Sequence, residues 1–401
     1  ATSIGAYDKL INSFDPAIFG LELQKEAILL QLAGSPQKVL PDRTVLRGDI
    51  SILLVGDPGI AKSQLLKYTV NSAARGFYTT GMNSSSAGIG AAVLRDPNGG
   101  FVLEAGAAVL TDLGVLAIDE LGKLSKENMG VLNEIMEQQT VSISKAGINV
   151  NLNARTSILA ALNPVDAKYD PYKGIVDNIN LPIPLLTRFD LIFILKDEPN
   201  PERDRDITQH IAQIRKNSKL PKEPPVDFEF MKRYLLFAKR INPELTDEAI
   251  VRLQDFYQTM RKNADPQGLT VTPRWYEGLI RLTLARARLM LRDRTNEDDA
   301  LRAIKITEAM LRTTATDIVT KKVDVGLLYN KPISEKSLRE GALETFKRFG
   351  GETREPVEDR AFFEEMEKQG KFTREQIEKI FQDMWKAGVT FEVRAHFFKK
   401  A

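Results

Sequence analysis

Short apolar runs that end in polar or turn-forming residues dominate the first half of the chain. Because most of them are apolar throughout rather than alternating, they predict strands buried on both faces of a parallel sheet. Sequence with helical periodicity separates them, so we predict an α/β domain over residues 1–215. The expected strands are Ser51–Val55, Gly76–Thr80, Val115–Ile118, Ile158–Leu162 and Leu191–Leu195.

The second half has helical periodicity alone after a polar, proline-rich stretch at 216–226, which predicts a linker. We predict a helical subdomain over 216–322, with Thr295 and Asp298 as a capping box before its last helix. The expected helices are 228–241, 246–263, 273–293 and 296–313.

Residues 323–401 are predicted to form three helices and then a strand pair, with a short strand or wing over 389–398, where apolar and polar residues alternate. That order is typical of a winged helix-turn-helix domain, which can contact DNA or protein. The expected helices are 334–348, 357–369 and 373–387.

Composition narrows the chemistry that this chain can carry. Its 401 residues suggest two or three domains, and the absence of cysteine excludes disulfides and thiolate metal sites. The only histidines are His210 and His396, which argues against a histidine metal site or a Ser-His-Asp triad. A net charge of +2 gives no general attraction to nucleic acid. Without a membrane-length apolar run or a signal peptide, we expect an intracellular protein with no membrane partner.

A glycine-rich segment, Gly56–Ser63, follows the first predicted strand and leads into a helix expected at 64–73. A loop in this place turns backbone N–H groups and a helix N-terminus toward an anion. Lys62 would reach the outer phosphates of a nucleotide, and the Ser63 hydroxyl would bind Mg²⁺. The strict pattern has glycine where Ala61 stands, so we expect a negative φ at Ala61. A chance glycine-rich turn is the alternative.

Polar side chains also end two later strands. Asp119 and Glu120 follow Val115–Ile118, a strand that we expect next to the phosphate-loop strand. Asp119 would hold Mg²⁺, and Glu120 would orient the attacking water. Asn163 would hydrogen-bond the γ-phosphate or that water. The alternative is that Asp119 and Glu120 are ordinary exposed acids and that Asn163 only forms a turn. Together with the phosphate loop, however, these three residues predict a nucleoside triphosphatase.

Several segments together resemble the AAA+ motor of the minichromosome maintenance (MCM) replicative helicases, in its archaeal form. The resemblance covers roughly residues 7–315 and includes the alanine before the loop lysine. It implies a P-loop AAA+ αβα sandwich with a parallel sheet and a helical lid, followed here by the small winged-helix domain. The segments that carry it are Gly56–Gln64, Leu103–Leu110, Ile118–Glu120, Glu137–Gly147, Leu152–Arg155, Leu186–Asp190 and Thr272–Arg274.

The resemblance implies an ATP site shared between the subunits of a homo-hexamer. Arg188 is similar to the family's arginine finger, and Arg274 to its sensor-2 arginine, and each would reach the neighbour's nucleotide. Arg47 and Gln138 match positions at the same boundary. The residues alone leave two alternatives open: Arg188 could form an ion pair with Asp190, and Arg274 could be a solvated residue at the start of a helix.

The cofactors implied are ATP and Mg²⁺, with Mg²⁺ at Ser63 and Asp119. The catalytic set would be Lys62, Asp119, Glu120, Asn163, Arg188 and Arg274. The adenine would lie at Ile18 and Phe19. The phosphates would lie along Gly56, Asp57, Pro58, Gly59, Ile60, Ala61, Lys62, Ser63 and Gln64.

Two insertions would contact DNA. Residues 140–152 alternate on both sides of a turn, which predicts a β-hairpin with Lys145 at its tip. The resemblance makes this the hairpin that lines the ring's channel, where Lys145 would track phosphates of a single strand or fork without reading sequence. Residues 87–104 resemble the helix-2 insert. An ordinary surface lysine is the alternative for Lys145.

We therefore predict an ATP-dependent DNA helicase motor that acts with other replication proteins, in the cytoplasm of an archaeal cell or the nucleus of a eukaryotic one. Gly122 and Met82 depart from the family pattern, and the family's amino-terminal region is missing from this sequence. The rivals are another AAA+ remodelling ATPase, such as a chelatase or a transcription activator, and a catalytically silent relative that binds DNA or regulates the ring.

Overall fold

The structure of the chain is a computed structural model. Two compact units divide the chain: residues 1–169, 178–264 and 270–314 form the first, and 170–177, 265–269 and 315–401 the second. The residues described are 5–82, 86–95, 101–145, 147–166, 168–170, 175–197, 199–217, 220, 223–262, 272–314, 357–358, 362–364, 366, 374, 377–378, 381, 390–394 and 397–400.

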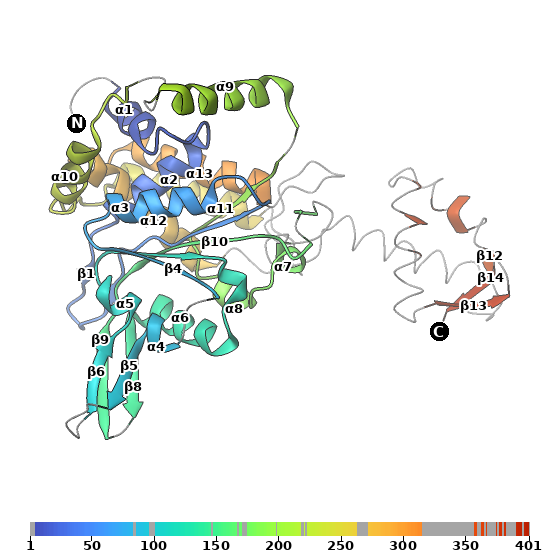
Figure 1. Cartoon of the computed structure of the whole chain (residues 1–401), viewed down its shortest axis with the longest axis horizontal. Helices are drawn as coiled ribbons and strands as arrows, with labels where there is room; N and C mark the ends of the chain where they lie inside the picture. The colour runs from blue at the N-terminus through green and yellow to red at the C-terminus, as the bar shows by residue number, and fades with distance from the viewer. Residues whose placement is uncertain are drawn as a thin grey trace. The chain divides into compact units, whose positions relative to one another are not determined.

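A five-stranded parallel sheet lies at the centre of the first unit (Figure 1). All its strands except β4 are buried along their whole length, as their unbroken apolar runs predict. The strand order is β11-β3-β10-β7-β4. The bounds are β3 Ile52–Gly56, β4 Gly76–Thr80, β7 Val115–Asp119, β10 Ser157–Leu162 and β11 Leu191–Leu195.

The position of β7 corrects the expectation that it lies next to β3. Strand β10 stands between them, with Leu162 opposite Val55 and Ala160 opposite Ile118. The runs are about equally apolar, so nothing in their composition distinguishes one order of parallel strands from another. As a result Asn163, which follows β10, stands between the phosphate loop and the acid pair at the carboxyl edge.

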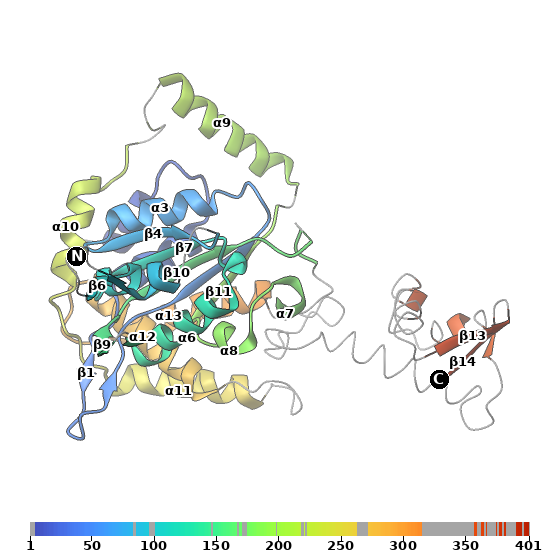
Figure 2. The ribbon, with the colours of Figure 1, turned by 60° about the horizontal axis from the view of Figure 1, so that its bottom comes forward.

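Helices cover both faces of the sheet. Helix α3 (Lys62–Ser72) packs against β4, β7 and β10, and α13 (Glu297–Thr314) packs against β11. Figure 2 shows α3 on one side, with α13 and α6 (Lys126–Gln138) on the other. This is the αβα sandwich predicted. The other helical turns here are α1 Ala6–Ser13, α2 Glu22–Ala33, η1 Leu121–Lys123, α7 Ile175–Asn178 and α8 Ile183–Leu186.

Two hairpins project side by side from one end of this unit (Figure 1), and β5 contacts β8. The β8–β9 hairpin is the one predicted around Lys145. The β5–β6 hairpin lies between the short helices α4 and α5, in the segment that resembles the helix-2 insert. The bounds are α4 Ser86–Ile89, β5 Ala91–Arg95, β6 Phe101–Ala105, α5 Ala107–Leu110, β8 Thr140–Lys145 and β9 Ile148–Asn153, and a third hairpin pairs β1 Lys38–Val39 with β2 Val45–Leu46.

The four predicted lid helices are present, and a cluster of buried residues that includes Leu253 and Leu279 joins three of them. One cap was predicted a residue too early. Asn296 and Asp299, rather than Thr295 and Asp298, exchange side-chain bonds with each other's backbone N–H. The bounds are α10 Phe228–Ala238, α11 Asp247–Lys262, α12 Pro273–Leu289 and α13 as above.

Helix α9 (Pro201–Asn217) was not predicted, because it is rich in charge and most of its side chains are exposed. It also moves the start of the expected linker from 216 to the residues after 217. In the described part of the chain, no helix is long and apolar enough to cross a membrane.

The second unit contains a three-stranded sheet of order β12-β14-β13. It corrects one expectation, because Val357 begins a strand rather than a helix. The strand pair expected at the end of the chain is present, since β13 and β14 pair antiparallel. The expected helix at 334–348 and His396 lie outside the described residues, as does most of 357–369 and 373–387. The bounds are β12 Val357–Glu358, β13 Thr390–Arg394 and β14 Phe397–Lys400.

A buried carboxylate joins the lid to the sandwich. Arg302 on α13 donates two hydrogen bonds to Glu26 on α2, at 2.5 and 2.6 Å, and the Tyr7 hydroxyl donates a third at 2.7 Å. The Glu26 side chain is only 2% exposed. A carboxylate so far from water is stable only with these partners.

We expect Arg302→Ala to lower the free energy of unfolding by about 3 kcal/mol, because it leaves the Glu26 carboxylate buried without its cation. Urea denaturation measures this loss. Arg252→Ala is the matched control, since Arg252 and Glu297 form an exposed pair worth less than about 1 kcal/mol. Similar losses in both variants would contradict the assignment.

Candidate functional site

The loop after β3 has the backbone of an anion-binding loop. A Cβ at Gly56 would lie 2.7 Å from the Leu195 carbonyl oxygen, so only glycine fits beside β11. Gly59 has a φ of +89°. Ala61 has a φ of +53°, which corrects the expectation of a negative angle. The loop needs the left-handed conformation at the residue before α3, and alanine adopts it at a cost of about 1–2 kcal/mol.

Lys62 is the first residue of α3 and is 7% exposed. Its ammonium donates to the carbonyl oxygens of Gly56 and Asp57, both at 2.7 Å. Burial lowers the pKa of Lys62, while the carboxylates of Asp119 and Asp57 act in the opposite direction. The influence of Asp119 indicates that the acid of β7 lies close to the loop lysine, although β10 separates their strands.

Asp57 is buried, and its side chain faces the protein rather than a phosphate. One carboxylate oxygen accepts from the backbone N–H of Tyr169 at 3.0 Å, and the other from that of Asp197 at 3.1 Å. These residues follow β10 and β11. Asp57 therefore fixes the loop to the two neighbouring strand ends and can offer a ligand only its main chain.

Asp119 ends β7 and is held by two hydrogen bonds. Its Oδ2 accepts from the Tyr78 hydroxyl and its Oδ1 from the backbone N–H of Glu120, each at 2.9 Å. Burial, followed by Asp119, raises the pKa of Tyr78 to about 12, so the phenol stays a proton donor. Tyr78 was not among the predicted site residues. Tyr78 lies near the end of the predicted strand Gly76–Thr80, and the end of that strand pairs with Asp119. This position is the one sequence signal that could have pointed to Tyr78.

Glu120 has a left-handed backbone, with a φ of +53°. Its carboxylate accepts from Lys123 at 2.8 Å, and the Lys123 ammonium lies 3.6 Å from the Met82 sulfur. The two departures from the family pattern, Met82 and Gly122, therefore flank one exposed ion pair. Because this pair is exposed, it restrains Glu120 only weakly.

Ser63 and Asn163 are both exposed at the carboxyl edge. Among the described residues, no group of three or more His, Asp or Glu side chains could hold a metal by itself. Mg²⁺ usually takes one or two protein ligands together with phosphate oxygens and water. The oxygen donors Ser63 and Asp119, beside the buried cation of Lys62, fit a magnesium–nucleotide complex.

Three arginines lie on a different part of the first unit. Arg188 precedes β11 and is 8% exposed. It donates to Glu137 at 2.6 Å and to the side chain of Asn133, both on α6. It does not pair with Asp190, which instead binds Arg281 of the lid. The alternative that Arg188 simply forms an ion pair with Asp190 is therefore wrong.

Arg47 and Arg274 lie near Arg188. Burial lowers the pKa of Arg274, and the positive charges of Arg47 and Arg188 lower it further. Arg47 donates to the carbonyl oxygen of Met136 at 3.0 Å. In the described part of the chain, one guanidinium nitrogen of Arg47 and one of Arg188 are buried without a hydrogen-bond partner. Arg47 also lies 3.6 Å from Asp49 and 3.9 Å from Asp190, so the cluster has carboxylate partners and keeps two N–H donor groups that an anion could use.

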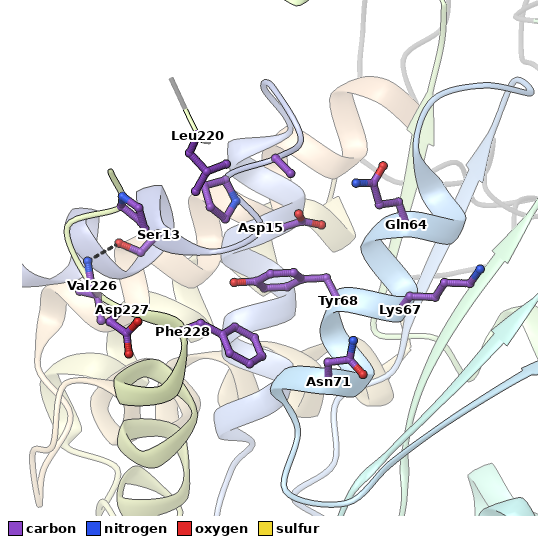
Figure 3. A pocket seen from close by; sticks show the side chains of 13 residues that line it. Ser13, Asp15, Gln64, Lys67, Tyr68, Asn71, Leu220, Val226, Asp227 and Phe228 are labelled. Atoms are coloured by element: carbon purple, nitrogen blue, oxygen red, sulfur yellow. Dashed lines mark hydrogen bonds between the residues drawn. The ribbon is translucent and has the colours of Figure 1, made fainter. Parts of the chain in front are cut away.

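Beside α3 lies a pocket of about 550 Å³ lined by Asp15, Pro16, Ala17 and Gln64, among others. Figure 3 shows Gln64 and Tyr68 extending from α3, with Asp15 on the segment beside them. Burial raises the pKa of Asp15 to about 6, and Lys25 opposes that rise. Lys25 also donates to the carbonyl oxygen of Ile18 at 2.6 Å, which fixes the chain just before Phe19.

Lys145 is exposed at the end of β8, as predicted for the hairpin tip, and Gly147 has a φ of +79°. The hairpin register pairs Lys145 with Ile148. Gln138, also predicted at a boundary, ends α6 and is exposed.

Two family models match the chain. The MCM P-loop domain matches residues 1–215, and the MCM AAA-lid domain matches residues 229–311. Together they cover the α/β sandwich and the four helices after it.

Curated relatives match as well. The chain is 39% identical to the minichromosome maintenance protein MCM of Saccharolobus solfataricus over 98% of its length. It is 42% identical to the DNA replication licensing factors MCM4 of Oryza sativa, over 80% of its length, and mcm7 of Schizosaccharomyces pombe, over 76%. The chain spans 57%, 38% and 42% of the length of these three proteins.

We expect Ala61→Gly to raise the free energy of unfolding by about 0.5–1 kcal/mol, because glycine adopts the left-handed conformation without strain. Ala73→Gly is the control: Ala73 has a φ of −76°, so that variant should lose stability. Urea denaturation of both variants measures whether the free energy of unfolding rises in Ala61→Gly and falls in Ala73→Gly. Losses in both variants would show that Ala61 carries no backbone strain.

Proposed function

This chain belongs to the minichromosome maintenance family, and on that premise we propose that it is the ATP-hydrolysing motor of an MCM-type DNA helicase. Its partners would be single-stranded or forked DNA, further copies of itself in a hexameric ring, and other replication proteins. It would act wherever the cell replicates its DNA, with ATP and Mg²⁺ as cofactors.

One observation carries this proposal: the two halves of the site lie at opposite edges of one sheet. Lys62, Asp119 and Asn163 follow strands at the carboxyl edge, whereas Arg188 precedes β11 at the amino edge. A five-residue strand is about 16 Å long. Arg188 therefore serves a phosphate bound by another copy rather than one bound by its own chain.

Each residue has a distinct task in this mechanism. Lys62 and the loop N–H groups bind the outer phosphates, and Ser63 with Asp119 would hold Mg²⁺, which supplies charge neutralisation when bound. Glu120 orients water toward the γ-phosphate, and Asn163 stands between loop and acid to position it. Tyr78 holds Asp119 in its orientation through the 2.9 Å bond.

From the neighbouring copy, Arg188 would neutralise the charge that develops on the γ-phosphate, and Arg274 would support it. The unpaired guanidinium nitrogen of Arg188 favours this reading over a structural ion pair. Assembly then controls hydrolysis, because a lone chain lacks the second cation.

We expect Lys62→Ala and Arg188→Ala each to lower ATPase activity by roughly 10³-fold, whereas a mixture of the two regains activity. In the mixture, intact Lys62 from one variant meets intact Arg188 from the other. ATPase rates measured against protein concentration, with light scattering to confirm assembly, test this. Arg252→Ala is the control. An assembled but inactive mixture, or full activity in monomeric Arg188→Ala, would refute the shared site.

We expect Lys145→Ala to weaken binding of single-stranded DNA and to reduce the slope of log affinity against log salt by about 0.7 for each lysine that engages a phosphate. The same loss should appear on any sequence. Fluorescence anisotropy at several salt concentrations provides both quantities. Lys305→Ala, an exposed lysine on α13, is the matched control. An unchanged slope would remove Lys145 from the DNA interface.

A further inference from the structure

Helix α9 contacts the sandwich through an aromatic pair, among other residues of one face. The ring of His210 lies 5.7 Å from the ring of Phe19, at an angle of 54°. Most of α9 is exposed, but Ile207, His210 and Ile214 are half-buried, at the spacing of one helix face. Phe19 itself remains 40% exposed. The pair therefore leaves aromatic surface open beside the chain segment that leads into α2.

The imidazole of His210 has an unmet hydrogen-bonding capacity. Its Nε2 is buried and has no hydrogen-bond partner among the described residues. A buried polar nitrogen without a partner is unfavourable, and its presence calls for an explanation such as an absent ligand. Either tautomer of a neutral imidazole can serve, because Nε2 donates in one and accepts in the other.

This pair lies toward the base end of the proposed nucleotide site. Pro16 and Ala17 line the same pocket as Gln64, the residue that follows Ser63 on α3. The segment 16–19 thus runs past the first turn of the phosphate-binding helix. A nucleotide with its phosphates on the loop extends its base toward this segment.

We infer that His210 contacts the purine base of the bound nucleotide, with Phe19 offering a ring face and Nε2 of His210 a hydrogen bond to the base edge. A purine has a flat π surface that can cover the exposed ring of Phe19, and donors and acceptors on its rim that can give Nε2 of His210 a partner. The inference rests on the proposed function, because it assumes that the loop binds a nucleotide.

The assignment gives α9 a role in the cycle. Helix α9 lies between β11 and the lid helix α10 in the chain. A base held by His210 would therefore fix the segment that leads into the lid.

The test compares a ligand that has a base with one that lacks it. ATP and inorganic tripolyphosphate, each with Mg²⁺, are titrated into the full chain by calorimetry. We expect His210→Ala to weaken ATP binding about tenfold, as removal of one buried contact does, and to leave tripolyphosphate binding within about twofold. Phe19→Ala should act in the same direction, and His210→Gln should recover part of the loss.

Gln209→Ala, an exposed neighbour on α9, is the matched control, and thermal melting without nucleotide checks that each variant folds. Unchanged ATP binding in His210→Ala would overturn the inference. Equal losses for ATP and tripolyphosphate would also overturn it, because they would indicate an effect on the loop. Failure of the unaltered chain to bind either ligand would instead refute the proposed function.

Discussion

A charge removed from water needs a counter-charge inside the protein, and this requirement organises the first unit. At Glu26 it is met within the chain, by Arg302 and the Tyr7 hydroxyl. At Arg288 it is met by four backbone carbonyls, at the ends of α2 and α10, and burial lowers the pKa of that guanidinium to about 10. Arg188 pairs with Glu137, and Arg47 with Asp49 and Asp190, but one guanidinium nitrogen of each arginine has no hydrogen-bond partner among the described residues. The networks at Glu26 and Arg288 join lid helices to α2, and the one at Arg188 and Arg47 keeps hydrogen-bond donors without acceptors.

The loop lysine and the acids lie at one edge of the sheet, and the clustered arginines lie at the other. All five strands are parallel, so the loop lysine and the acids gather at one edge while Arg188 and Arg47 precede strands at the other. The central position of β10 adds Asn163 between lysine and acid. This separation of the lysine and acids from the arginines is the feature on which the proposed sharing of a site between copies rests.

The residues of the strands and of the loop predicted most of this arrangement. Unbroken apolar runs predicted the sheet, and GDPGIAKS predicted the loop, because each pattern reflects a local requirement for burial or for backbone geometry. The order of β7 and β10 was not predictable, since it depends on how crossovers pack. The left-handed Ala61 ran against the usual preference of alanine, and tertiary contacts override such a preference. Helix α9 was missed because its exposed face carries charge, and His210 because a single histidine gives no pattern.

Helix α6 connects parts of the molecule that would otherwise be independent. It starts six residues after Glu120, ends two residues before the Lys145 hairpin, and carries Asn133 and Glu137, the partners of Arg188. Thirteen helical residues form a rod about 20 Å long. Because Arg188 holds the end of this rod that leads into the Lys145 hairpin, a change in its contact with Glu137 would be felt directly at the base of that hairpin.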